Sequence, residues 1–342
     1  MTFLELLLLS SLPIAFSFSH FAFGATTTLL PDIEVQALQD IAKTLGKKDW
    51  NFSIDPCSKQ PPWFFSNASK GHENAVTCNC TFANSTVCHV VSILLKAQRL
   101  PGTVPPESEL VRLPYLQVID LTRNYLNGTI PPEWGSMKLV SISLLGNRVS
   151  GSIPKELANI TTLKSLSIEY NQFSGNLPPK LGNLPQIERM LMSSNNFTGE
   201  IPATFAKLTT LKDFRIADNH FSGSIPDFIQ NWTNLEKLGL SGPIPTGSSF
   251  LAKVNDLRIS DLNGTDMSFP LISSMTKLKT LILMSCNIIG PLPEYLGQLP
   301  NLSTLDISFN KLSGGIPSNF RSLRQVEYHE GMDNCYFSLH LV

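Results

Sequence analysis

Residues 302–317, LSTLDISFNKLSGGIP, decide the fold because the same pattern returns along most of the chain. Apolar residues stand at Leu302, Leu305, Ile307 and Leu312, and the stretch ends in Gly-Gly-Ile-Pro. The pattern recurs as LQVIDLTRNYLNGTIP (116–131), LVSISLLGNRVSGSIP (139–154), LKSLSIEYNQFSGNLP (163–178), IERMLMSSNNFTGEIP (187–202) and LKDFRIADNHFSGSIP (211–226). A fixed period of this length predicts a solenoid, in which each unit packs mainly against its two neighbours.

Ten units are present, and their first apolar positions follow each other at nearly constant steps. These positions are 90, 116, 139, 163, 187, 211, 235, 254, 278 and 302. The pattern is that of the leucine-rich repeat. It predicts an α/β solenoid shaped as a horseshoe, with a parallel β-sheet on the concave face.

Alternation within each unit predicts which side chains face the core. In the unit from 302, Leu302, Leu305 and Ile307 are expected to point inward, and Asp306 and Phe309 to point out on the concave face. A turn-position asparagine recurs at 124, 147, 171, 195, 219 and 310. Its amide suits backbone groups left unpaired where the chain leaves the strand, so these asparagines are expected to be structural.

The charge composition does not predict binding to nucleic acid or to a charged membrane surface. The chain has 342 residues, 42% hydrophobic and 15% charged, with a net charge of −1. Neither sign dominates, so nothing favours nucleic acid or a charged membrane surface. Residues 1–24 are apolar and end in small residues, which predicts a cleaved signal peptide, with a retained anchor as the rival. No other apolar run approaches the roughly 20 residues that span a bilayer, so no transmembrane helix is expected in the mature chain.

Ten Asn-X-Ser/Thr sequons agree with a secretory route and predict a glycosylated surface. Nine are candidate glycosylation sites: Asn51, Asn67, Asn84, Asn127, Asn159, Asn196, Asn231, Asn263 and Asn301. The tenth, Asn79, is doubtful because it lies between Cys78 and Cys80.

The segment 25–88 precedes the repeats and is expected to form an N-terminal cap. Residues 32–46, DIEVQALQDIAKTLG, have the spacing of an amphipathic helix that ends at a glycine. Cysteines follow at 57, 78, 80 and 88, with His89 beside the last of them. These residues permit a zinc site or two disulfides. The secretory route and the C-x-C spacing favour disulfides, for which the sequence alone permits three connectivities.

Three units depart from the pattern, and so does the C-terminal tail. Gln98 and Cys286 take the asparagine position, where Cys286 is expected to be a buried thiol rather than a reactive one. The unit from 235 lacks about five residues, which makes 240–265 the least regular part of the array. Residues 321–342 show no further repeat and are expected to be an irregular, truncated tail.

The Gly-x-Ile-Pro units resemble the plant-type leucine-rich repeat. The cap segments DWNF, DPC, VTCNC and TVCHV, and units such as LRISDLNG and LILMSCNIIGPLPEYLGQLPNL, resemble one branch of plant receptor-like serine/threonine kinases over roughly residues 30–320. In that branch the repeats are followed by a malectin-like domain, one membrane helix and a kinase. The resemblance implies the disulfides Cys57–Cys78 and Cys80–Cys88. The sequence features together predict the division into signal peptide (1–24), cap (25–88), repeats (89–320) and tail (321–342).

The resemblance implies an extracellular binding domain in plasma-membrane signalling. The expected ligand is a peptide, a protein or a wall carbohydrate, with a co-receptor kinase ectodomain as a further partner. Outward residues of the concave sheet are the candidate contacts: Asp120, Arg123, Glu169, Tyr170, Arg189, Asp213, Arg215, Asp218, Asp256, Arg258, Asp306 and Phe309. Their mixed charge and aromatic rings suit a peptide or protein. No cofactor or metal site is expected.

Alternative functions are a soluble inhibitor of wall-degrading enzymes, similar to polygalacturonase inhibitors, or a secreted decoy receptor. The kinase motifs for phosphate binding and catalysis are absent from the sequence, so the chain itself is not expected to be an enzyme. Outward carboxylate pairs such as Asp213 and Asp218, or Asp256 and Asp261, lack the desolvated setting that acid–base catalysis needs. The expected location is the apoplast for this chain and the plasma membrane for a full-length receptor.

Overall fold

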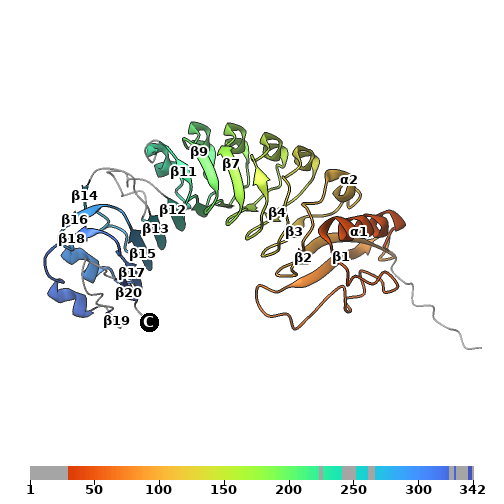
Figure 1. Cartoon of the computed structure of the whole chain (residues 1–342), viewed down its shortest axis with the longest axis horizontal. Coiled ribbons are helices and arrows are strands. Elements are labelled where there is room, and N and C mark those ends of the chain that lie inside the picture. The colour runs from red at the N-terminus through yellow and green to blue at the C-terminus, as the bar shows by residue number, and fades with distance from the viewer. Residues whose placement is uncertain are drawn as a thin grey trace, which may run out of the picture.

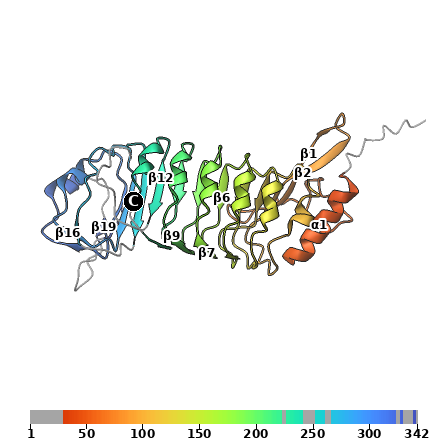
Figure 2. The same cartoon turned by 90° about the horizontal axis from the view of Figure 1, so that it is seen from above.

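The computed structural model describes residues 30–222, 226–240, 252–260, 266–322, 327–328 and 338–340. Figure 1 shows the coils stacked into a continuous arc, with the cap helix at the N-terminal end. Seen from above, the coils lie side by side in a single row (Figure 2). The predicted solenoid is confirmed.

One long sheet runs through the array and has thirteen strands among the described residues. After the hairpin of β1 (Asn74–Phe82) and β2 (Val87–Leu95), its parallel strands are β3 (Val118–Asp120), β4 (Ser141–Ser143), β6 (Ser165–Ser167), β8 (Arg189–Leu191), β10 (Asp213–Arg215), β12 (Lys237–Leu240), β13 (Asp256–Ser260), β15 (Thr280–Met284) and β17 (Thr304–Asp306). The pairing register places Ile119, Ile142, Leu166 and Met190 in one row, and all four are buried. The period of the sequence therefore becomes a continuous apolar core.

The rest of each coil consists of short strands and 3-10 turns. A second sheet contains β5 (Ser150–Gly151), β7 (Gln172–Asn176), β9 (Asn196–Gly199) and β11 (His220–Phe221), and a third contains β14 (Met267–Ser268), β16 (Ile288–Gly290) and β18 (Lys311–Leu312). The 3-10 turns are η1 (Pro132–Ser136), η2 (Lys155–Asn159), η3 (Pro179–Asn183), η4 (Ala203–Lys207), η5 (Asp227–Asn231), η7 (Glu294–Gln298) and η8 (Ser318–Ser322). The repeated glycine has positive φ, for example 75° at Gly199, where a Cβ would also approach Asn176 Oδ1 to 2.6 Å.

The repeated asparagines join neighbouring coils, as the sequence predicts. Asn195 Nδ2 donates to the carbonyl oxygens of Ile168 and Met192 at 3.0 and 3.1 Å. Its Oδ1 accepts the N–H of Phe173 in the preceding coil at 3.0 Å. Asn195 is 5% exposed, so one side chain satisfies backbone groups that water does not reach.

The cap covers the N-terminal end of the apolar core. Helix α1 (Asp32–Leu45) ends at Gly46, whose φ of 73° closes the helix, and a short α2 (Glu107–Leu110) lies within the first repeat. The structure pairs Cys57 with Cys78 and Cys80 with Cys88, the pairing that the resemblance implies, so these sulfurs are not zinc ligands.

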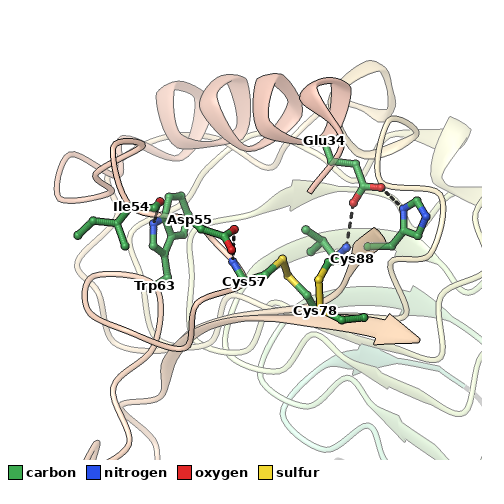
Figure 3. Close-up of a disulfide and its surroundings, with 10 residues drawn as sticks. Glu34, Ile54, Asp55, Cys57, Trp63, Cys78 and Cys88 are labelled. Atoms are coloured by element: carbon green, nitrogen blue, oxygen red, sulfur yellow. Dashed lines mark hydrogen bonds and ion pairs between the residues drawn. A yellow bond between two sulfur atoms is a disulfide. The ribbon is translucent and has the colours of Figure 1, made fainter. Parts of the chain in front are cut away.

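A buried acid ties α1 to the hairpin. Glu34 is 1% exposed; its carboxylate contacts His89 Nδ1 and accepts the Val90 N–H at 2.8 Å. Figure 3 shows Glu34 pointing from α1 toward the strand that carries Cys88. The boundary expected at residue 88 falls inside β2, since that strand belongs to both the cap hairpin and the parallel sheet.

The irregular units adapt in different ways. Gln98 Nε2 donates to Lys96 O at 2.8 Å, and Gln98 Oε1 accepts from Lys47 Nζ at 3.1 Å. The hydrogen-bond partners of Gln98 therefore differ from those of the repeated asparagines. Cys286 is buried, with Sγ 3.4 Å from Ile259 O and 3.3 Å from Met284 O, which agrees with a structural thiol.

Two segments that the sequence analysis singled out, 240–265 and 321–342, are described only in part. Most of the irregular stretch 240–265 lies outside the described residues. In the segment expected to be irregular, β20 (Ser338–His340) pairs antiparallel with β17, and β19 (Glu327–Tyr328) pairs antiparallel with β20, so both extend the long sheet. Within the described residues, no helix is both long and apolar enough to cross a bilayer.

Candidate ligand-binding surface

One position in most of the described coils has a left-handed backbone conformation. It directly precedes the asparagine position and lies at the edge of the concave sheet. We term its members the edge row: Ala97, Arg123, Tyr170, Ser194, Asp218, Ser285 and Phe309, whose φ values run from 52° to 57°. Gly146 occupies the same position in its coil, with φ 67°. Four of the twelve predicted contact residues therefore share one structural position.

Any residue other than glycine at the edge row is unfavourable for the fold. A non-glycine residue in this conformation costs about 1–2 kcal/mol, and Gly146 shows that glycine fits the turn. Tyr170 and Phe309 are nevertheless 61% and 54% exposed, so burial of their rings does not offset the strain. Strained residues that the core does not require are typical of functional surfaces.

Acid–base pairs occupy the middle of the concave sheet. Arg215 Nε and Nη2 lie 2.8 and 3.2 Å from the two carboxylate oxygens of Asp213. Arg258 clasps Asp256 in the same way, at 2.8 and 3.3 Å. The register places Gly239 between the two arginines, which leaves a gap in the side-chain layer. Because each guanidinium contacts both carboxylate oxygens of its aspartate, it is held in one orientation before any ligand binds.

Two of the predicted outward residues are buried instead. Glu169 is 7% and Asp213 6% exposed, although the alternation places both on the concave face. For Asp213, charged side chains nearby explain the burial, because Arg189 Nε from the preceding coil also lies 3.9 Å from Asp213 Oδ2. Burial raises the pKa of the Glu169 carboxyl, against the lowering effect of the nearby Arg215 charge. These two acids orient their neighbours rather than face solvent.

The N-terminal end of the concave sheet is used by the cap. Arg123 Nη2 donates to Gly71 O at 2.6 Å. Lys96 Nζ lies 3.3 Å from Asp120 Oδ2 and 3.4 Å from Glu73 Oε2. Asp120 and Arg123 therefore tether the loop before β1, and the accessible part of the surface begins beyond them.

At the C-terminal end, Asp306 accepts hydrogen bonds from the backbone N–H and hydroxyl of Ser308 at 3.0 and 2.7 Å. Ser308 is 6% exposed and only Phe309 projects strongly from this strand end. Asp218 accepts from the Ser194 and Ser260 hydroxyls at 3.1 and 3.3 Å. The structure thus brings Tyr170, Arg189, Arg215, Asp218 and Arg258 together, with Phe309 farther along the array.

The sequons leave the strands of the concave sheet open. Asn51, Asn67, Asn84, Asn127, Asn159, Asn196, Asn231 and Asn301 are all exposed, while Asn79 is half-buried. None of these lies in β3 to β17 of the long sheet, and Asn263 is outside the described residues.

Separately, a groove of about 840 Å³ runs along one flank, lined by Ile153, Pro154, Lys155 and Lys180 among others; we term it the flank groove.

The repeat geometry and the surface it carries define a leucine-rich-repeat protein. The Leucine Rich Repeat family model matches residues 115–137, 162–184, 186–208, 210–232 and 301–323. Two probable LRR receptor-like serine/threonine-protein kinases of Arabidopsis thaliana are 49% identical over 291 residues and 48% identical over 296. The alignments cover 83% and 84% of this chain. The chain is therefore homologous to plant LRR receptor-like serine/threonine kinases.

A solved structure supports the same relationship. The Arabidopsis receptor kinase HAESA, in complex with the peptide hormone IDA and the co-receptor SERK1, matches with a TM-score of 0.69 at 32% identity. The match covers 85% of this chain and 47% of that chain. The chain spans 28% of the length of each of the two kinases above, and the region that it matches is ectodomain-like.

The edge row had no clear signal in the sequence. Its members precede the asparagine position but share no residue type, so their common left-handed conformation is seen only in the structure. No group of three or more potential metal-ligating side chains is found in the part of the chain that the structure describes.

Proposed function

We propose that this chain is the extracellular ligand-sensing domain of a receptor-like serine/threonine kinase at the plant plasma membrane. It reaches that location through the secretory pathway as a glycoprotein. The observation that carries the proposal is the edge row, because exposed Tyr170 and Phe309 occupy strained positions that the core does not need. Phosphorylation by a kinase elsewhere in the same receptor would be the output.

The ligand that fits best is a peptide lying along the concave sheet. An extended peptide matches a row of side chains that recurs along the array, and aromatic rings supply contact area at low entropic cost. Arg215 and Arg258, each oriented by its own aspartate, offer fixed donors to carboxylates or carbonyls of the peptide. HAESA, at 32% identity, has a peptide hormone and a co-receptor in its complex, which supports the same two kinds of partner here.

The test separates binding from folding. The glycosylated chain is immobilised and exposed to peptides from plant apoplastic fluid; retained peptides are identified by mass spectrometry, synthesised and titrated calorimetrically. Replacing Tyr170 and Phe309 by glycine is expected to weaken binding at least tenfold, since two aromatic contacts are lost. The same variant is expected to unfold no earlier than the wild type, because glycine relieves two left-handed residues.

A matched variant changes the flank groove through Lys155→Ser and Lys180→Ser, and it is expected to bind normally. Peptide affinity that drops in the flank variant and persists in the glycine variant would refute the concave site. Retention of no peptide beyond that held by an unrelated repeat protein would refute the sensing function itself.

A further inference from the structure

A second hollow lies in the N-terminal cap, between the start of β1 and the loop before it. We term it the cap groove; its lining includes Phe64, Phe65, Asn67, His72, Asn74 and Gln98. Its volume is about 690 Å³, within the roughly 300–1,000 Å³ typical of small-molecule sites. It combines aromatic rings with amide groups, which is the chemistry that binds a sugar.

Asn74 is the polar group in this groove that needs a partner. It is the first residue of β1 and is 7% exposed. Its side-chain Oδ1 is buried, and no donor among the described residues hydrogen-bonds to it. A buried acceptor without a donor lowers stability, so a donor supplied by a group bound in the groove would stabilise the cap.

A sequon stands on the rim of the same groove. Asn67 begins the sequon Asn-Ala-Ser and is exposed, and Phe65 two residues earlier is 41% exposed. The N–H of Ala68 donates to Phe65 O at 3.3 Å, which closes a turn around Asn67. The N–H of Phe65 donates to Asn74 O, also at 3.3 Å, so this turn begins beside Asn74.

We propose that the first N-acetylglucosamine of a glycan on Asn67 occupies the cap groove. The apolar face of the sugar ring packs on Phe65, and an N–H or O–H of the sugar donates to Asn74 Oδ1. The host enzyme forms the bond between Asn67 Nδ2 and the sugar C1 from a lipid-linked oligosaccharide; the lipid diphosphate leaves and the amide loses one proton. This inference rests on the proposed secretory route.

Two other sequons also have an aromatic residue two positions before the asparagine, but these rings are already in contact with protein groups. Phe82, before Asn84, lies 4.7 Å from the His89 ring and 4.5 Å from the Tyr115 ring, centroid to centroid. Tyr125, before Asn127, is covered by the Arg148 guanidinium at 5.1 Å. The combination of a groove, an aromatic ring and an unpaired acceptor therefore singles out Asn67.

The experiment uses the full chain secreted from plant cells. Ser69→Ala removes the Asn67 sequon and leaves Asn67 and Phe65 in place. Thr161→Ala is the matched control, because it removes the exposed sequon at Asn159, at the end of η2. Glycopeptide mass spectrometry measures occupancy, and calorimetry measures Tm. We expect Ser69→Ala to lower Tm by about 2–4 °C and Thr161→Ala by less than about 1 °C.

A Phe65→Ala variant connects the loss to the ring. It is expected to lower Tm in the glycosylated chain but to have little further effect once Ser69→Ala has removed the glycan. Three outcomes would overturn this inference and leave the proposed function standing. They are additive Tm losses from Phe65→Ala and Ser69→Ala, an unchanged Tm in Ser69→Ala, and an Asn67 without glycan in a chain whose Asn159 is glycosylated. Empty sequons throughout the secreted chain would overturn the secretory proposal with it.

Discussion

Replacing Asn195 by alanine tests whether the asparagine ladder stabilises the solenoid. The change removes the Oδ1 acceptor of the Phe173 N–H and the Nδ2 donor to the carbonyls of Ile168 and Met192. A buried unsatisfied N–H costs about 1–3 kcal/mol, and the weakened carbonyls bring the expected loss to about 2–4 kcal/mol. Guanidinium unfolding followed by circular dichroism measures the loss, and hydrogen exchange at the Phe173 amide locates it.

Asn234→Ala is the matched control for this prediction. Its Nδ2 makes an exposed bond of 3.0 Å to Thr209 O, so we expect a loss below about 1 kcal/mol. Equal losses in the two variants would refute the idea that buried ladder bonds matter more than exposed ones.

Asn195→Asp sharpens the same argument because its shape hardly changes. A carboxylate there would face the carbonyl oxygens of Ile168, Met192 and Ser193, which now accept from Nδ2. We expect the variant to be less stable at pH 7 than at pH 4, where a protonated acid again offers one donor. A stability difference from wild type that does not change with pH would contradict this account.

Three further outcomes are expected. Glu169→Gln should raise the free energy of unfolding at pH 7 by up to about 1 kcal/mol. Burial raises the Glu169 pKa above its ordinary 4.5, so the ionised carboxyl lowers the stability of the native state as pH rises past that value. Guanidinium unfolding at a series of pH values should show the stability gain of Glu169→Gln vanish near pH 4. A gain that does not change with pH would contradict this account. Buried Cys286 should resist iodoacetamide in the native chain and react after denaturation, as mass spectrometry can show. Arg123→Ala should speed amide exchange in residues 71–73, because the bond to Gly71 O is lost; unchanged exchange would show that Lys96 alone holds this loop.

The long-range partners of particular residues show where sequence reasoning stopped. The pattern around Asp213 predicts an outward strand residue, but its burial depends on Arg215 and on Arg189 from the preceding coil. Arg123 follows the same outward pattern, yet it binds the cap at Gly71, 52 residues away in sequence. Such contacts leave no periodic signal, because each involves a different pair of residue types.

The sequence by itself determined the solenoid, its period, its asparagine ladder and its glycine turns. These features repeat, and each depends on residues within one coil and the same positions in the next. Tertiary structure alone decided which concave residues remain accessible, which side chains occupy the strained edge row, and where the cap groove lies beside Asn67. The physical reason is that accessibility, strain and an unpaired acceptor arise from the full set of neighbours in space, which differs from coil to coil.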